Sequence, residues 1–216
     1  MAMPLRPVEV SRIESCGAGA WILWWRRDFD FLPGQVVALS ILPTADQRLY
    51  SLASGAGDDE AGVLFNLAPE GWLTPQLAAI RPGDRIYVSP PFGSFVGFPG
   101  PAVWVATGTG VAPFRSMVRS GLAGGKLLVH GARTRDSFYS QEVLEASLGD
   151  NYVRCASADS GQGLFPGRLT KYLEDQHWPS DRPYYLCGST AMVIEVREIL
   201  IARGVPYQNI VSEVYF

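Results

Sequence analysis

The sequence has few cysteines, and their number and spacing exclude several classes of protein. Cys16, Cys155 and Cys187 are odd in number and far apart along the chain. A disulfide framework is therefore not expected, and neither is an iron–sulfur cluster, which needs several closely arranged thiolates. We expect no metal centre in this chain. Free thiols at unrelated positions are typical of a protein from a reducing cytoplasm.

The sequence also has little net charge and no long apolar run. The formal net charge is −3 over 216 residues, so a bulk attraction to nucleic acid is not expected. There is no run of about 18 apolar residues that could cross a membrane. The first ten residues, MAMPLRPVEV, have no apolar core of signal-peptide length. We therefore expect a soluble, cytoplasmic protein with neither nucleic acid nor membrane as a partner.

The first half of the chain has the pattern of short strands separated by turns. One short helix is expected from Thr74 to Ile80, ahead of the turn at 81–84. Six strands at this spacing predict an antiparallel barrel or sandwich. The expected strands are rich in β-branched or aromatic residues and read VEVSRIES, AWILWWRR, GQVVALSIL, RLYSLAS, GVLFNLA and DRIYVSP.

After residues 98–101 the pattern changes to strands that alternate with helices. This alternation predicts a parallel sheet covered on both faces, and it places a domain boundary near residue 99. The expected strands are AVWVATG, KLLVHGA, NYVRCAS, YYLCGS and IVSEVYF, and the expected helices cover 111–120, 140–148, 167–175 and 189–204.

A glycine-rich turn follows the first of these parallel strands. Gly108, Thr109 and Gly110 lie between an apolar strand and a helix, where backbone N–H groups at the positive helix end can receive a pyrophosphate. Pro113 is tolerated near the helix start because its missing N–H would have been unpaired there. The third glycine of the usual dinucleotide fingerprint is absent. A tight turn without a ligand therefore remains open on this motif alone.

Several segments together resemble the ferredoxin–NADP reductase family, in the same order along the chain. Residues 48–54, RLYSLAS, resemble its flavin motif, and residues 71–74, GWLT, resemble its second phosphate-contacting turn. The segments PFG, TGTGVAPFRSM, HGARTRDSFY, CGSTAMV and SEVYF resemble later parts of the family pattern. The resemblance covers essentially the whole chain. It implies a Greek-key antiparallel β-barrel that binds FAD over 1–98, followed by an NAD(P)-binding parallel α/β domain over 99–216.

On the flavin side, the resemblance implies a role for each residue of the two motifs. Arg48 carries a planar cation suited to a diphosphate, Tyr50 gives an aromatic face for the isoalloxazine, and Ser51 can hydrogen-bond flavin N5. Thr74 is expected to cap the following helix, to hold phosphate, or both. Outside such a motif these would be ordinary strand and turn residues. The implied FAD contacts are Arg48, Leu49, Tyr50, Ser51, Gly71, Trp72, Leu73 and Thr74.

On the nucleotide side, the resemblance implies that Cys187 lies against the nicotinamide and that Glu213 belongs to the catalytic neighbourhood, together with Ser51. Tyr215, with Phe216 beyond it, would cover the flavin face that nicotinamide must reach. A buried small hydrophobe is the alternative for Cys187, and filling of a sheet edge is the alternative for the aromatic tail. The implied nucleotide contacts are Thr107, Gly108, Thr109, Gly110, Arg133, Ser157, Arg168, Cys187, Gly188, Tyr215 and Phe216.

The choice between NADPH and NADH depends on cations for the 2′-phosphate. Arg133 and Arg168 match two family arginines that hold this phosphate, whereas Ala158 replaces a third. Asp159, next to it, would disfavour phosphate. NADPH is favoured, and NADH remains the alternative.

The expected function is hydride transfer between NADPH and FAD, with single electrons exchanged with ferredoxin or flavodoxin. Two alternatives stay open within the same class of enzyme: an NADH-dependent reductase component of an oxygenase system, and a free-standing flavin reductase. A non-catalytic flavin-binding module is the alternative from a different class.

Overall fold

The computed structural model describes residues 3–215. Within it the chain folds into two compact units. The first contains the residues up to Gly97 together with Ala112–Ser120, and the second contains Phe98–Val111 and the residues from Gly121 onward. A separate FAD domain at 1–98 and nucleotide domain at 99–216 stay predictions.

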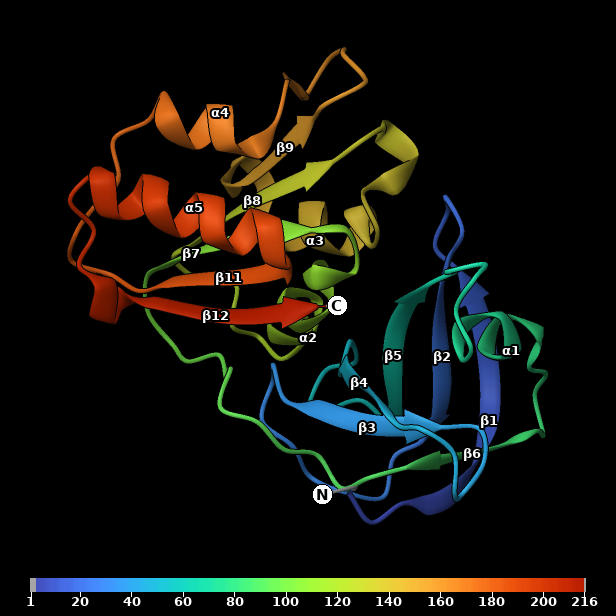
Figure 1. Ribbon diagram of the computed structural model, residues 1–216. Helices are drawn as coiled ribbons and strands as arrows, with labels where there is room; N and C mark the ends of the chain where they lie inside the picture. The colour runs from blue at the N-terminus through green and yellow to red at the C-terminus, as the bar shows by residue number, and fades with distance from the viewer. Residues whose placement is uncertain (1–2, 216) are drawn as a thin grey trace. The chain divides into compact units, whose positions relative to one another are not determined.

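The first unit is an antiparallel barrel (Figure 1). Its strand order is β4-β3-β6-β1-β2-β5. An antiparallel bridge between Leu52 and Val63 joins the β4 side to β5, so the sheet closes on itself and neither end is left as a free edge. The predicted antiparallel barrel is confirmed. The strands are β1 Arg6–Ser15, β2 Ala20–Arg26, β3 Val36–Ser40, β4 Arg48–Ser51, β5 Glu60–Asn66 and β6 Arg85–Val88.

The core of this barrel comes from alternate residues of the strands, which point to one face of a pleated sheet. Helix α1, Thr74–Ala79, adds Leu77 to this core, and Leu73 packs there just before the helix. Large strand residues buried in this core are Leu23, Trp25, Val37, Leu39, Val63, Phe65, Ile86 and Val88.

Helix α2, Ala112–Arg119, was expected after the glycine-rich turn, and it begins there. It nevertheless packs on the barrel. Arg115 donates to the Ala53 carbonyl, and Arg119 forms an ion pair with Asp58 at 2.8 Å. The helix therefore continues the chain of the second unit but packs as part of the first.

The second unit is a parallel sheet of order β10-β9-β8-β7-β11-β12 (Figure 1). Every pairing in this sheet is parallel, as the alternating pattern predicted. The two-residue strand β10 was not expected. The elements are β7 Ala102–Thr107, the 3₁₀ turn η1 Gly108–Val111, β8 Lys126–Ala132, α3 Gln141–Leu148, β9 Tyr152–Ala156, β10 Phe165–Pro166, α4 Leu169–Glu174, β11 Tyr184–Ser189, α5 Thr190–Ala202 and β12 Ile210–Tyr215.

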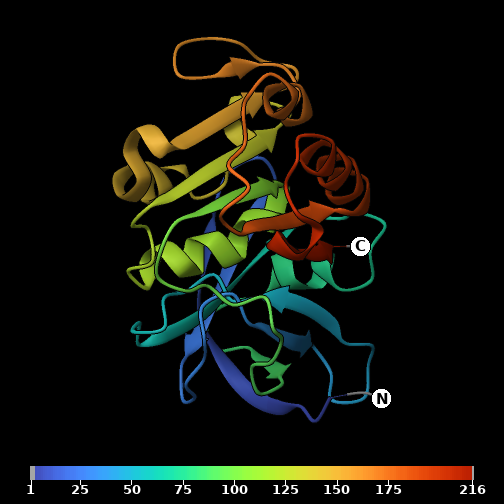
Figure 2. The same cartoon turned by 90° about the vertical axis from the view of Figure 1, so that its left-hand side faces the viewer.

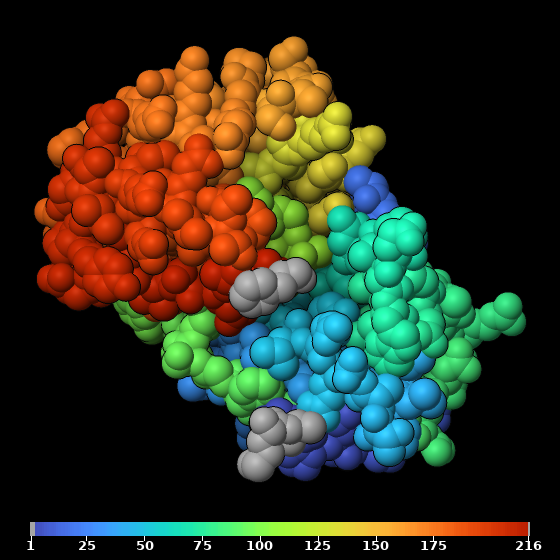
Figure 3. Space-filling model, in the orientation of Figure 1, coloured from blue at the N-terminus to red at the C-terminus, as the bar shows by residue number. Residues whose placement is uncertain are grey.

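Helices cover both faces of the parallel sheet. On one face, Leu173 of α4 and Val196 and Leu200 of α5 pack on the buried strand residues Val105 and Leu186. Helix α3 lies on the other side of the sheet (Figure 2). Helices α4 and α5, in orange and red, form one continuous outer surface of this unit (Figure 3). The carboxyl ends of β7, β8, β10 and β11 lead into the next helical elements, and α5 begins directly after β11.

The barrel leaves no room for a side chain at Gly62. A Cβ there would come within 2.6 Å of the Trp24 ring, and Trp24 is only 3% exposed. We expect Gly62→Ala to lower the free energy of unfolding by about 1–3 kcal/mol, because the ring must leave its packed position. Gly57→Ala is the matched control, since nothing lies within 4 Å of a Cβ at that position. Equal midpoints for the two variants in urea unfolding would contradict this packing.

Candidate functional site

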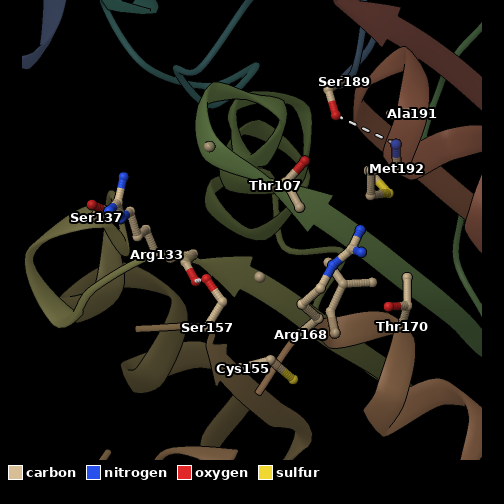
Figure 4. Close-up of a pocket in the computed structure, with 14 residues that line it drawn as sticks. Thr107, Arg133, Ser137, Cys155, Ser157, Arg168, Thr170, Ser189, Ala191 and Met192 are labelled. Carbon is tan, nitrogen blue, oxygen red and sulfur yellow. Dashed lines mark hydrogen bonds between the residues drawn. The ribbon is translucent and has the colours of Figure 1, made fainter. Parts of the chain in front are cut away.

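The second unit has a pocket at the carboxyl edge of its parallel sheet. Because parallel strands all point the same way, the turns after β7, β8, β9 and β11 meet at this edge, where open α/β sheets bind their ligands. The pocket has a volume of about 360 Å³. It is lined by Thr107, Gly108, Gly131, Ala132, Arg133, Ser137, Cys155, Ser157, Arg168, Leu169, Thr170, Ser189, Ala191 and Met192 (Figure 4).

Five of the predicted nucleotide contacts line this pocket together. They come from four separate segments, which only the parallel pairing brings to one place, and they are Thr107, Gly108, Arg133, Ser157 and Arg168. Sequence reasoning missed Ser137, Thr170 and Ser189. Ser189 had a usable signal, since it directly precedes a helical stretch as an N-cap residue would. Cys155 is fully buried and also lines the pocket.

Backbone hydrogen bonds hold the two sides of the pocket next to each other. Ser157 donates its N–H to the Ala132 carbonyl at 3.0 Å, and Ala158 donates to the Arg133 carbonyl at 2.8 Å. These bonds continue the pairing of β8 and β9 beyond the strand ends. Arg133 therefore lies beside Ser157 (Figure 4).

The glycine-rich turn is packed directly against β11. A Cβ on Gly110 would overlap the Cys187 carbonyl oxygen, so only glycine fits this position. Gly188 has a φ of +154°, and a Cβ there would overlap the Thr107 hydroxyl. The predicted residues Cys187 and Gly188 thus lie against Gly110 and Thr107, although Gly110, Cys187 and Gly188 do not line the pocket. Thr109 is part of the same 3₁₀ turn.

The Thr107 hydroxyl oxygen is buried and has no hydrogen-bond partner within residues 3–215. An unpaired buried hydroxyl costs free energy unless a ligand or a water satisfies it. Ser189 accepts a hydrogen bond from the Met192 N–H at 3.4 Å and caps α5, whose positive end therefore faces the pocket. These features suit the phosphates of a dinucleotide.

The charges around the pocket are partly paired. The Arg168 guanidinium donates to Glu195 at 2.6 Å, whereas Arg133 makes no ion pair within the described residues. Asp159, which was expected to disfavour phosphate, accepts the backbone N–H groups of Arg135 at 3.1 Å and Ser160 at 2.7 Å. The Arg135 bond, followed by the Ser160 bond, lowers the pKa of this carboxyl, so Asp159 is anionic at neutral pH. Both signs of charge are thus present near Arg133.

Cys187 and Glu213 lie side by side on neighbouring strands. The parallel register of β11 and β12 pairs Cys187 with Glu213 and Ser189 with Tyr215. Burial raises the pKa of the Cys187 thiol well above its usual value, and the Glu213 charge raises it further, while a hydrogen bond with Tyr215 opposes both. Cys187 is therefore a neutral thiol at pH 7. Phe216 lies outside the described residues.

The flavin motif forms strand β4 of the barrel. Arg48 is exposed and Leu49 is 59% exposed, whereas Ser51 is buried. The Arg48 guanidinium donates to the Gln47 carbonyl at 3.3 Å and makes no ion pair within residues 3–215. Burial raises the pKa of Tyr50 to about 12, against the opposing charge of Arg48. An accessible cation beside an aromatic ring fits a flavin diphosphate and its ring system.

The second flavin turn, Gly71 to Thr74, leads into α1. Trp72 is 44% exposed, and Leu73 is buried in the barrel core. The prediction that Thr74 caps this helix is wrong, because Thr74 is already the first helical residue and Leu73 occupies the N-cap. The Thr74 hydroxyl instead accepts the Ala68 N–H at 2.9 Å and closes the turn around Gly71.

Within residues 3–215, no helix combines the length and the apolar character needed to cross a membrane.

Comparison with known proteins identifies the class of protein to which this fold and site belong. The oxidoreductase NAD-binding domain matches residues 104–198. The solved structure of a ferredoxin NADP⁺ reductase from Neisseria gonorrhoeae with bound FAD and NADP has a TM-score of 0.88, covers 100% of both chains and is 18% identical. At that identity the likeness shows the fold alone. The chain has the fold of a two-unit dinucleotide oxidoreductase.

Two curated relatives define the family. The flavodoxin/ferredoxin–NADP reductase of Rhodobacter capsulatus is 35% identical over 81% of this chain and 76% of its own. The reductase component of propane 2-monooxygenase from Mycolicibacterium goodii is 31% identical over 84% of this chain, and the match spans only 58% of that relative's length. The chain belongs to the ferredoxin–NADP reductase family.

The three cysteines provide a test of the burial described here. Cys16 is half-buried, whereas Cys155 and Cys187 are fully buried. Burial raises the pKa of all three thiols, to about 12 for Cys155, so only a small fraction of each is thiolate at pH 8. Because alkylation needs both access and thiolate, we expect iodoacetamide to label Cys16 first. Mass spectrometry of peptides from the folded protein measures this order, and early labelling of Cys187 would contradict its enclosed position.

Proposed function

We propose that the protein is an FAD-dependent oxidoreductase that transfers hydride between NADPH and FAD and exchanges single electrons with a carrier protein such as ferredoxin or flavodoxin. The observation that carries this proposal is the pocket in which Thr107, Gly108, Arg133, Ser157 and Arg168 converge, in a chain that also has the flavin motif on strand β4. Family membership supports the same pair of cofactors. FAD, when bound, would accept hydride and release electrons singly.

The residues of the flavin motif would bind FAD in the barrel. Arg48 would hold the diphosphate, since its guanidinium is exposed and free of a carboxylate partner within the described chain. Tyr50 would stack on the ring system, and Ser51 would hydrogen-bond N5. Gly71, Trp72, Leu73 and Thr74 would complete the site.

The nucleotide would bind in the pocket of the second unit. The N–H groups of the Gly108–Gly110 turn and the Thr107 hydroxyl would contact the pyrophosphate, because that hydroxyl is buried and without a partner in residues 3–215. Cys187 would position the nicotinamide as a neutral thiol. Glu213, half-buried beside it, would hold charge near the reacting ring, and Tyr215 with Phe216 would cover the flavin until nicotinamide displaces them.

The reductase component of an oxygenase system is the second candidate. The propane 2-monooxygenase reductase component favours it, as does the toluate 1,2-dioxygenase electron transfer component of Pseudomonas putida, which is 31% identical over 85% of this chain. This chain spans 58% of the length of each. Ala158 and Asp159 would suit NADH in that role. We place the protein in the cytoplasm, because its three cysteines are all free thiols.

The first prediction from the proposed function concerns FAD. The purified protein is expected to be yellow and to bleach when NADPH is added without oxygen. Arg48→Ala should weaken FAD binding by about tenfold or more, because a hydrogen bond to a charged group contributes about 1.5–3 kcal/mol. Arg85→Ala is the control, since Arg85 is also an exposed arginine of a barrel strand, on β6. Equal FAD affinities for the two variants would remove Arg48 from the site. A colourless protein that binds no FAD would contradict the function.

The second prediction concerns the choice of nucleotide. Arg133→Ala and Arg168→Ala should raise KM for NADPH far more than KM for NADH, because only NADPH carries the 2′-phosphate. Ala158→Arg should sharpen the preference by adding a cation beside Ser157. Steady-state kinetics with both nucleotides measure these changes, and NADH serves as the internal control. A wild-type kcat/KM that is higher with NADH would favour the oxygenase-reductase candidate.

A further inference from the structure

Helix α2 is fastened to the loop that follows the flavin motif. Arg119 donates through Nε to Asp58 Oδ2 at 2.8 Å and through Nη2 to Oδ1 at 2.9 Å. Asp58 Oδ2 also accepts the Gly55 N–H at 2.7 Å. Arg115 donates to the Ala53 carbonyl one turn earlier on the helix. We call Ala53, Asp58, Arg115 and Arg119 the α2 clasp.

The loop rests directly on the end of the helix, with no space between them. A Cβ on Gly55 would approach the Arg119 carbonyl oxygen to 2.9 Å and the Arg119 Cβ to 3.0 Å. Ala56 donates its N–H to the Ser120 hydroxyl at 2.9 Å. Two successive backbone amides of the loop are therefore satisfied by the clasp or by the residue that follows it. These bonds join the loop to α2, so a shift of either element alone would strain or break them.

Arg115 restricts movement between α2 and the loop. The residue is only 6% exposed, and its Cζ lies 5.3 Å from the centre of the Trp24 ring. Burial lowers the pKa of Arg115 to about 10, so the side chain is still a cation at neutral pH. A buried cation held by a carbonyl and an aromatic face has few alternative positions, because any other would leave it without a partner.

The chain connects this clasp to both predicted cofactor motifs. Ala112 of α2 directly follows Val111, the last residue of the glycine-rich turn. On the other side, Ala53 lies two residues after Ser51 of the flavin motif. We propose that the α2 clasp is a positioning device that transmits nucleotide binding at the Gly108–Val111 turn to the flavin-motif loop. The inference rests on the proposed function, and it assigns Asp58 and Arg119 a role through α2 rather than contact with either cofactor.

The test uses the full chain loaded with FAD and two variants, Arg119→Ala and Asp58→Asn. Asp58→Asn keeps an acceptor for the Gly55 N–H and removes only the charge. Hydrogen exchange of the Gly55 and Ala56 amides, followed with and without NADP⁺, reports the clasp independently of activity. We expect NADP⁺ to slow both amides in the wild type and to leave them unchanged in the variants. In both variants, stopped-flow reduction of the flavin by NADPH should be about tenfold or more slower than in the wild type. Small misplacements of reacting groups lower the rate of such a step strongly.

The affinity for NADP⁺ shows whether the clasp residues position the reacting groups or bind the nucleotide. NADP⁺ affinity should change much less than the reduction rate, since neither residue is proposed to touch the nucleotide. Arg182→Ala is the control, because it removes an arginine that pairs with its neighbour Asp181 at 2.9 Å in the second unit. Variants that are reduced as fast as Arg182→Ala, or whose amides still respond to NADP⁺, would overturn the clasp. A wild-type protein that NADPH does not reduce would instead contradict the proposed function.

Discussion

Parallel pairing of β7 with β8 and β11 is the constraint on which the candidate nucleotide site depends. It aligns the carboxyl ends of these strands, so that Thr107, Arg133 and Ser189 reach one edge of the sheet although they are far apart in sequence. The close approach of Gly110 to the Cys187 carbonyl then holds the glycine-rich turn against β11. Any side chain at Gly110 would separate the two and open the site.

Charges of both signs around this edge would bear on the choice between NADPH and NADH. Arg133 is unpaired within residues 3–215, Arg168 is shared with Glu195, and Asp159 is kept anionic by two backbone N–H groups. A 2′-phosphate bound here would gain from Arg133 but would compete with Glu195 for Arg168 and would meet the charge of Asp159. A free 2′-hydroxyl would meet none of these penalties. Small substitutions in this region should therefore shift the preference strongly.

Helix α2 shows how chain order and packing can differ. Its sequence follows the nucleotide turn, so a division of the chain by pattern alone assigns it to the second half. Its packing partners lie in the first unit, because Arg115 and Arg119 bind the loop between Ala53 and Asp58. Nothing in the periodicity of the helix indicates which of the two units its arginines contact. Ion pairs and carbonyl contacts between distant segments leave no local pattern.

Local pattern was enough to predict the strands other than β10, the α-helices, and the order of an antiparallel sheet before a parallel one, since alternation of side chains and turn residues follow from neighbours in sequence. The resemblance to the ferredoxin–NADP reductase family marked Arg133, Ser157 and Arg168, because family motifs keep their spacing. The capping role predicted for Thr74 was wrong, since the exact helix start depends on how Leu73 packs in the barrel. Only the tertiary structure decided that Ser137, Thr170 and Cys155 line the pocket, and that Asp58 binds Arg119. These arrangements depend on distances between segments that the chain brings together only when it folds.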